Sequence, residues 1–313
     1  MISYRWRAEL DAEERAQVSA LVRAAAEYDA EAGFSAIPPS VTGERSHASI
    51  RVAHLPILAR RDLSVRVDAP WVTVAYLNLA VDADGAGTVR FVVHPDYRSR
   101  GIATLLTEEL GLDTAAPGGW AGTGARSLRA WAYGTHPATE RLAARFDIAA
   151  IDRRWTLVRH LSGPWAVPLA GLASEAALPG SEPVRDLPGL VELETELLPG
   201  PVRETPAVEH GRERAITVRD ADGPMGMVRF DTACGDRDGF RAAWIGAVVV
   251  APRAAGRGLG SALLSAALGE MRAAGVQLAL LRMDPREERA VRMCRLLAFE
   301  QEEAHVRFGV YAT

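Results

Sequence analysis

The feature that constrains this chain most is a repeat, because one pattern occurs in both halves, 157 positions apart. Residues 92–106 read VVHPDYRSRGIATLL, and residues 249–264 read VVAPRAAGRGLGSALL. In each copy a β-branched run ends at a proline, an Arg-Gly pair and a small residue follow, and an apolar helical pattern begins. A chain of 313 residues is long enough for two ordinary domains, which we place at 1–162 and 163–313.

The sequence around both copies predicts the same succession of elements. An antiparallel meander leads into each motif, an amphipathic helix follows it, and a strand, a second helix and a last strand complete each half. We expect an opening helix in each half, at 11–28 and 182–198, and a surface loop at 111–126. The pattern predicts an α/β (α+β) fold, in which each domain has a central mixed, mostly antiparallel sheet flanked by helices. The expected strands are 71–81, 88–93, 127–133 and 153–161 in the first half and 215–219, 225–231, 240–250, 277–283 and 305–311 in the second, with further helices near 137–146 and 285–298.

The strand-to-helix junction in each motif is typical of an anion site. The first turn of a helix exposes unpaired N–H groups, and the helix dipole adds positive potential there. Glycine lets the backbone approach a bulky pyrophosphate, and Arg100 and Arg257 are expected to add charge-assisted hydrogen bonds. Two alternatives remain: a turn that binds nothing, and a dinucleotide fingerprint, which Gly256-Arg-Gly-Leu-Gly260 fits only loosely.

Composition excludes several classes of protein. A formal net charge of -4 argues against a dedicated nucleic-acid binder. No apolar run approaches the roughly 18 residues that span a bilayer, so we expect a cytoplasmic protein without a membrane partner. Cys234 and Cys294 form no metal-ligand pair, and we expect no metal. The chain has no lysine, which excludes Schiff-base chemistry and a Walker A loop.

Several stretches carry a resemblance to a known family. In the first half they are Trp6-Arg-Ala-Glu-Leu-Asp-Ala-Glu-Glu14, Tyr76-Leu-Asn-Leu79, Val92-Val-His-Pro95, Arg98 to Ala103 and Trp131-Ala-Tyr-Gly-Thr135. With the meander and the second motif, they resemble the GNAT superfamily of CoA-dependent acyltransferases, over nearly the whole chain and twice. The tandem arrangement and the length are similar to those of the mycothiol synthase family, whose enzymes acetylate the cysteinyl amine of a cysteine–glucosamine–inositol conjugate.

The resemblance implies a function and a set of cofactor residues. The chain would be an N-acetyltransferase that uses acetyl-CoA, or another acyl-CoA, and a primary amine of a small molecule. In the family the second domain is the catalytic one and the first binds acetyl-CoA without evident turnover. Strand residues would pair with the pantetheine amides, as an added β-strand does. The implied cofactor residues are Phe91, Val92, Val93, Arg98, Ser99, Arg100, Gly101, Ile102, Ala103 and Thr104 in the first half, and Val248, Val249, Val250, Ala255, Gly256, Arg257, Gly258, Leu259, Gly260 and Ser261 in the second.

The second half departs from the family at its acid and base. Trp244 stands where the family usually has a glutamate, and Cys294 stands where it has the tyrosine that protonates the leaving thiolate. Cys294 is therefore a candidate acid or a buried apolar residue, and Tyr133 is a candidate in the first half. An acyltransferase acting on a different amine in specialised metabolism and a CoA-binding protein without chemistry both remain alternatives. The chain is expected to be a monomer or a homodimer.

Overall fold

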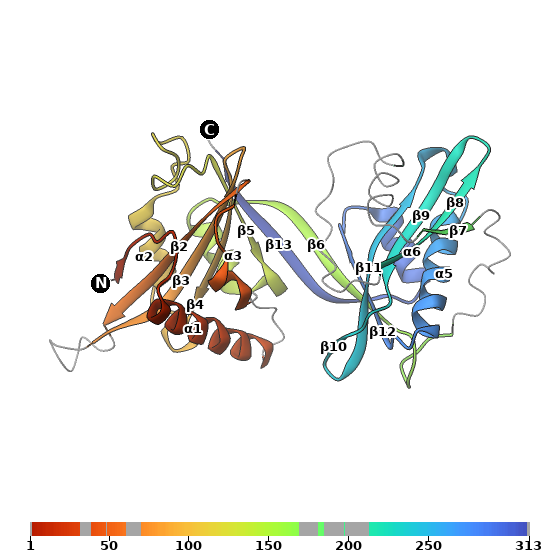
Figure 1. The fold of residues 1–313 in the computed structure, drawn as a ribbon, viewed down its shortest axis with the longest axis horizontal. Coiled ribbons are helices and arrows are strands. Elements are labelled where there is room, and N and C mark those ends of the chain that lie inside the picture. Colours follow the sequence, from red (N-terminus) through yellow and green to blue (C-terminus); the bar gives the residue numbers. More distant parts are fainter. Residues whose placement is uncertain are drawn as a thin grey trace. The chain divides into compact units, whose positions relative to one another are not determined.

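The computed structural model describes residues 2–31, 39–47, 49–60, 70–168, 181–184, 197 and 213–311 (Figure 1). The chain divides into two units, the first made of Met1–Arg153 and Ala304–Thr313 and the second of Arg154–Glu303. Each unit has a mixed sheet with flanking helices, so the predicted fold class is confirmed. Within the described residues, no helix has both the length and the apolar character needed to cross a bilayer.

The sheet of the first unit has the strand order β1-β2-β3-β4-β5-β13. Strands β4 and β5 run parallel, and the other neighbours run antiparallel. The strands are β1 Ile2–Tyr4, β2 Ile50–Arg60, β3 Trp71–Asp82, β4 Ala86–Val93, β5 Ser127–Ala132 and β13 Glu300–Tyr311; the helices and helical turns are α1 Ala12–Glu31, η1 Pro39–Gly43, η2 Pro95–Tyr97, α2 Ile102–Leu110, η3 Tyr133–Thr135 and α3 Pro137–Arg145.

Helices α1 and α2 pack on opposite faces of the first sheet, against side chains that alternate along β3. On one face Tyr76 of β3 packs with four buried apolar residues of α1. On the other face Leu77 and Leu79 pack with Ile102 and Leu106 of α2. The helix that follows the motif is therefore anchored by its apolar side, and its first turn is held at the end of β4.

The sheet of the second unit has the order β6-β12-β11-β9-β8-β7, with β10 paired to β11. Here β11 and β12 are the parallel pair. Phe230 of β9 and Ile245 of β11 pack against α5, which contributes seven fully or almost fully buried residues. The elements are β6 Ala149–His160, β7 Ser181–Val184, β8 Glu213–Asp220, β9 Gly223–Asp231, β10 Gly235–Arg237, β11 Phe240–Val250, η5 Pro252–Ala254, α5 Leu259–Ala273, β12 Leu278–Met283 and α6 Glu288–Leu296.

The two units differ from the predicted halves at their last strands. The sheet of the second unit includes β6, whose residues 155–160 pair with β12. The sheet of the first unit includes the end of β13, whose residues 306–311 pair with β5. The closing strand of each half thus completes the sheet of the other unit. A single boundary at 162/163 would assign both strands to the wrong unit.

Two local expectations differ from the structure, and one long strand was missed. The predicted helix at 182–198 begins in strand β7, and apart from Leu197 its remainder lies outside the described residues. Strand β2 was not predicted. The expected surface loop at 111–126 is partly buried, since Trp120 is 4% exposed and donates its indole N–H to the Gly111 carbonyl oxygen at 2.8 Å.

Candidate functional site

The two motif turns have the same main-chain conformation. Gly101 has φ 78° and ψ 8°, and Gly258 has φ 82° and ψ -2°, both in the left-handed region that favours glycine. The residues three positions before them also agree: Arg98 has φ -65° and ψ 157°, and Ala255 has φ -66° and ψ 149°. The sequence repeat is therefore a structural repeat at the level of single dihedral angles.

The hydrogen bonds of the turns also repeat at the separation of 157 residues. The Leu105 amide donates to the Gly101 carbonyl oxygen at 2.9 Å, and the Ala262 amide donates to that of Gly258 at 3.0 Å. The amides of 102–104 and 259–261, which precede them, have no main-chain acceptor in the described part of the chain. Each turn therefore presents three adjacent N–H groups at the positive end of a helix, as a diphosphate requires.

In the first unit the turn borders a pocket of about 710 Å³. The parallel pairing of β4 and β5 covers only 86–89 and 127–130, so the two strands separate beyond Val89. Residues of α1, the end of β4, the motif turn, the end of β5 and α3 line the opening. Most of the predicted first-half cofactor residues come together there: Phe91, Val92, Val93, Arg98, Ser99, Gly101, Ile102, Ala103 and Thr104.

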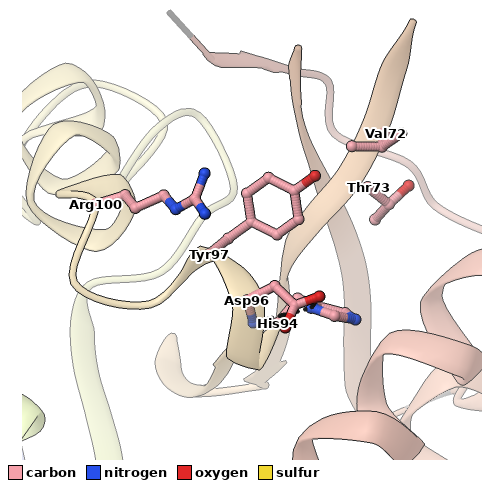
Figure 2. Close-up of a pocket in the computed structure, with 6 residues that line it drawn as sticks. All are labelled: Val72, Thr73, His94, Asp96, Tyr97 and Arg100. Carbon is pink, nitrogen blue, oxygen red and sulfur yellow. Dashed lines mark hydrogen bonds and ion pairs between the residues drawn. The ribbon is translucent and has the colours of Figure 1, made fainter. Parts of the chain in front are cut away.

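The arginines of the first motif are not free within this pocket. Arg98 lines it, but its guanidinium makes a two-point ion pair with Asp29 of α1 at 2.5 and 3.0 Å. Arg100 lines a separate pocket of about 540 Å³, where its guanidinium carbon lies 5.0 Å from the ring centre of Tyr97 (Figure 2). The Arg100 side chain lines this other pocket, so its expected contact with phosphate oxygens beside the amides stays a prediction.

The second motif follows a strand with a β-bulge. The register of β11 with β9 shifts between Ile245 and Ala247, at Gly246. A Cβ at Gly246 would lie 3.4 Å from the guanidinium carbon of Arg229, which forms an ion pair with Glu213 at 2.9 Å; the two side chains are 9% and 6% exposed. The parallel pairing of β11 with β12 covers 242–245 and 278–281, so these strands also separate before the turn.

The predicted second-half cofactor residues lie at the end of β11 and in the turn that leads into α5. Val248 and Val250 pack toward α5, while Val249 is buried on the opposite face. Gly260 lies in the first turn of α5, and a Cβ there would meet the Met293 sulfur at 3.1 Å and the Val250 side chain at 3.5 Å. A side chain at this position would therefore press on Met293 and lie beside the amides of the turn.

Cys294 is part of the core of the second unit. Its side chain belongs to the cluster around α5 and is 1% exposed. Burial raises the pKa of the thiol to about 12. A thiol with a pKa of about 12 is a weaker acid than an ordinary thiol at about 8.5, so it cannot readily protonate a leaving thiolate. This corrects the expectation that Cys294 is an acid and favours the packing role.

Tyr133 and Trp244 lie beside the separating strands of their units. Tyr133 lines the first-unit pocket, and its ring packs edge-on to His305 with centroids 5.6 Å apart. His305 Nδ1 accepts a hydrogen bond from the Gly134 amide at 3.1 Å, which holds the turn after β5. Trp244 lies under the guanidinium of Arg282, whose carbon is 4.8 Å from the ring centre. Tyr133 therefore stays a candidate, and Trp244 carries no titratable group.

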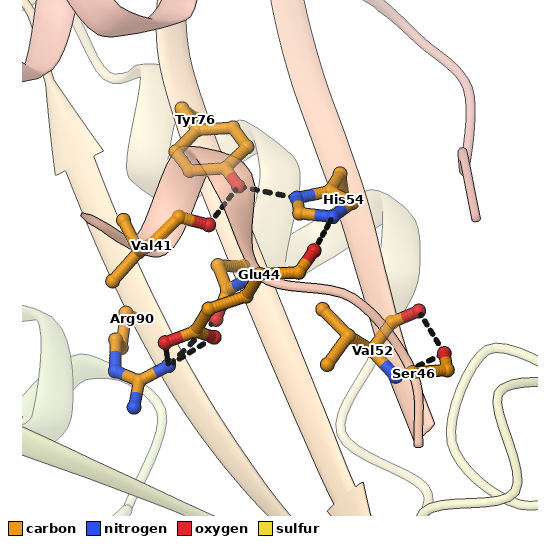
Figure 3. A network of polar contacts seen from close by, with 8 residues as sticks. Val41, Glu44, Ser46, Val52, His54, Tyr76 and Arg90 are labelled. Atoms are coloured by element: carbon orange, nitrogen blue, oxygen red, sulfur yellow. Dashed lines mark hydrogen bonds and ion pairs between the residues drawn. The ribbon is translucent and has the colours of Figure 1, made fainter. Parts of the chain in front are cut away.

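A buried polar network in the first unit was not predicted (Figure 3). The carbonyl oxygen of Glu44 lies 3.1 Å from His54 Nε2, so this nitrogen carries the proton. His54 Nδ1 then accepts from the Tyr76 hydroxyl at 2.6 Å. Burial lowers the pKa of His54 and raises that of Tyr76, in agreement with neutral side chains. The network fixes the segment after η1 against β2 and β3.

The same network reaches β4 at Arg90, the first residue beyond its pairing with β5. Arg90 Nη1 donates to the carboxylate of Glu44 at 2.9 Å and to Asn78 Oδ1 at 2.9 Å. The Asn78 Nδ2 atom is buried and has no hydrogen-bond partner within the described residues. The one sequence signal was the polar pair in Tyr76-Leu-Asn-Leu79, which alternates with buried leucines. In the described residues, no three His, Cys, Asp or Glu side chains form a metal site.

Known proteins resemble this chain in sequence and in fold over most of its length. Residues 187–299 match the model of the acetyltransferase (GNAT) family. The mycothiol acetyltransferase of Stackebrandtia nassauensis is 30% identical over 302 residues, which cover 91% of either chain. A GCN5-related N-acetyltransferase from Sphaerobacter thermophilus has a TM-score of 0.64 at 18% identity, covering 98% of this chain and 95% of its own. A tandem GNAT protein from the clavulanic acid biosynthesis pathway has a TM-score of 0.64 at 20% identity, covering 100% and 99%.

Proposed function

This chain belongs to the family of GNAT acetyltransferases that includes mycothiol acetyltransferase, and we propose that it transfers an acetyl group from acetyl-CoA to a primary amine of a small molecule. The first acceptor to consider is the cysteinyl amine of a cysteine–glucosamine–inositol conjugate, because the similarity to mycothiol acetyltransferase extends over both halves. An acyl-CoA donor follows from membership of the family. That the acyl group is acetyl is our proposal.

One observation carries the proposal: each unit has three adjacent free amides at a helix start, next to a pair of parallel strands that separate. The amides suit the diphosphate of the donor. The unpaired edge of β4 or β11 suits an extended amide-containing chain such as pantetheine. A donor held at both places would have its thioester where the strands part, and a strand amide there would polarise the carbonyl.

The remaining steps need a neutral amine and a proton for the leaving thiolate. In the first unit Tyr133 lines the pocket and is our candidate for the proton donor. In the second unit the buried Cys294 does not suit this role, and Trp244 replaces the usual glutamate. A carboxylate acting through water would serve as the base in either unit.

Donor binding is tested with two matched charge substitutions. Thr104 and Ser261 occupy the third position of α2 and α5, so Thr104→Asp and Ser261→Asp place a carboxylate beside one set of amides each. An aspartate in the first turn of a helix stabilises the helix, so both variants are expected to fold. Calorimetry with acetyl-CoA should find two sites in the parent chain, one in either variant and none in the double variant. Binding that survives in the double variant refutes the assignment of the turns.

Turnover separates the proposal from its main competitor, a CoA-binding protein without chemistry. The buried Cys294 and the tryptophan at position 244 favour the competitor, because the second unit then lacks both usual catalytic groups. Release of free CoA from acetyl-CoA is measured with the cysteine–glucosamine–inositol acceptor and with a panel of other small amines. Release above background with the first acceptor supports the specific proposal, and release with another amine alone supports the broader one. No release with any amine favours the competitor.

A further inference from the structure

We infer that Asp29 controls how tightly the first unit binds its donor, by competing with the donor's diphosphate for Arg98. The inference rests on the proposed function of the motif turn. It goes beyond that function because it assigns a role to a carboxylate on α1, which is 69 positions away from its partner in the sequence. No sequence pattern marks Asp29, since its role depends on a contact between distant segments.

The contacts of Arg98 show how firmly its charge is engaged. Its Nη1 and Nη2 atoms donate to the two carboxylate oxygens of Asp29 at 2.5 and 3.0 Å. The side chains are 23% and 15% exposed, so water screens the pair less than it screens a surface ion pair. The guanidinium is also 5.2 Å from the ring centre of Tyr28 and donates through Nε to the Val93 carbonyl oxygen at 3.2 Å.

Both members of the pair line the pocket that contains the motif amides. The carboxylate of Asp29 therefore puts a negative charge into a pocket that the proposal assigns to a diphosphate. Like charges a few ångströms apart repel, and more strongly where water is partly excluded. The positive charge of Arg98 is cancelled by Asp29 at the same time. Within the turn itself, the free amides of residues 102–104 are then left as the attraction for the phosphates.

Removing the charge of Asp29 should leave Arg98 in place. The bond to the Val93 carbonyl oxygen and the stacking on Tyr28 do not involve Asp29, so two of the three contacts persist in Asp29→Asn. The Nη atoms then have no carboxylate partner and are available to phosphate oxygens, which arginine binds well. Asp29→Asn should therefore bind the donor more tightly for two reasons. The repulsion between the carboxylate and the diphosphate is lost, and Arg98 is released to bind phosphate.

The second unit offers a comparison and a control. Its turn has Ala255 where the first has Arg98, so the competition is a property of the first unit. It also contains a matched ion pair, in which Arg253 binds the carboxylate of Asp220 at 2.5 and 3.0 Å. Asp220→Asn removes an arginine-bound aspartate of the same geometry and should leave donor binding by the first unit unchanged.

The test uses the full chain with Ser261→Asp, which restricts acetyl-CoA binding to the first unit. In this parent chain, Asp29→Asn is expected to lower the dissociation constant for acetyl-CoA about tenfold, as for the loss of one nearby charge at an intermediate dielectric. The gain should shrink in 1 M salt, which screens the repulsion. Adding Arg98→Gln should abolish most of the gain, because the released arginine is then missing.

Each outcome has one meaning. Unchanged or weaker binding by Asp29→Asn, with the parent binding normally, overturns the inference and makes Asp29 a residue that positions Arg98. A gain of equal size with Asp220→Asn also overturns it, because the effect would then be one of net charge. If neither the parent nor Asp29→Asn binds acetyl-CoA, the proposed donor site fails and this inference fails with it. If Asp29→Asn binds acetyl-CoA and the parent does not, the result supports both the proposed donor site and this inference.

Discussion

The clearest energetic prediction concerns the thiol of Cys294. The side chain is 1% exposed in the core of the second unit, and burial raises its pKa from 9.0 to about 12. Above pH 9 the unfolded chain therefore loses this proton while the folded protein keeps it. Because the folded state then binds more protons than the unfolded state, the free energy of unfolding falls as the pH rises from about 9 to about 12.

The size of the effect follows from the two pKa values. Between pH 8 and pH 10 the thiol should cost on the order of 1 kcal/mol of stability, and each further pH unit below 12 should cost about the same. Cys294→Ala removes this contribution. The substitution also lowers stability at every pH by about 1 kcal/mol through lost packing, so the slope against pH is the informative quantity.

This chain suits the measurement because it has no lysine. Cysteines and tyrosines are its main side chains that titrate between pH 8 and pH 11, and the tyrosines contribute equally to parent and variant. Urea unfolding is followed at several pH values in the parent, in Cys294→Ala and in Cys234→Ala, which removes the half-buried thiol. Equal slopes in the parent and in Cys294→Ala refute the reasoning. A large loss of acetyl transfer in Cys294→Ala without loss of structure would restore Cys294 as an acid.

Three further predictions concern stability. Ser99 has φ 60°, a conformation that costs a non-glycine residue about 1 kcal/mol, so Ser99→Gly should raise the free energy of urea unfolding of the first unit by up to that amount. Gly256→Ser, at the matching position, should lower the stability of the second unit. Changes in the opposite directions would contradict this reasoning. Ending the chain at Glu303 removes the strand that pairs with β5, so the β5 amides should lose protection from hydrogen exchange, and retained protection would speak against the strand assignment. Arg229→Met leaves Glu213 buried and unpaired and should cost about 3 to 5 kcal/mol, most of which Glu213→Leu in the same chain should recover; a cost that persists in the double variant points to packing.

Local patterns predicted much of the fold. Strand β11 occupies Phe240–Val250, the range predicted from its apolar run, and the helices after the motifs begin directly after Gly101 and Gly258. These elements depend on residues that are neighbours in the sequence: a β-branched run forms the strand, a proline turn follows it, a glycine with positive φ precedes the helix, and an apolar stripe anchors the helix. The sequence contains all of that information within about 25 positions.

Other features depend on distant partners and could not be read locally. Strand β2 contains His54 and Pro56 and is buried on both faces in its centre, so it lacks the alternation that marks a half-exposed strand. The choice of β5 as the partner of β13 is a pairing across more than 170 positions. Trp120 looks like a loop residue in sequence, but it packs edge-on against Trp6 with ring centres 5.9 Å apart.

In the candidate site, the main-chain conformation could be predicted from the local sequence, and the contacts of the side chains could not. Arg98 and Ala255 occupy the same place in the two turns and have almost the same dihedral angles, although one is a paired cation and the other has no polar group. The turn is therefore specified by the glycines and by the helix that follows, whatever side chain precedes them. Side chains such as Asp29 and Trp244 are fixed by long-range packing, and the motif says nothing about them. Donor binding should consequently be shared by the two units, while donor affinity and acceptor chemistry should differ between them.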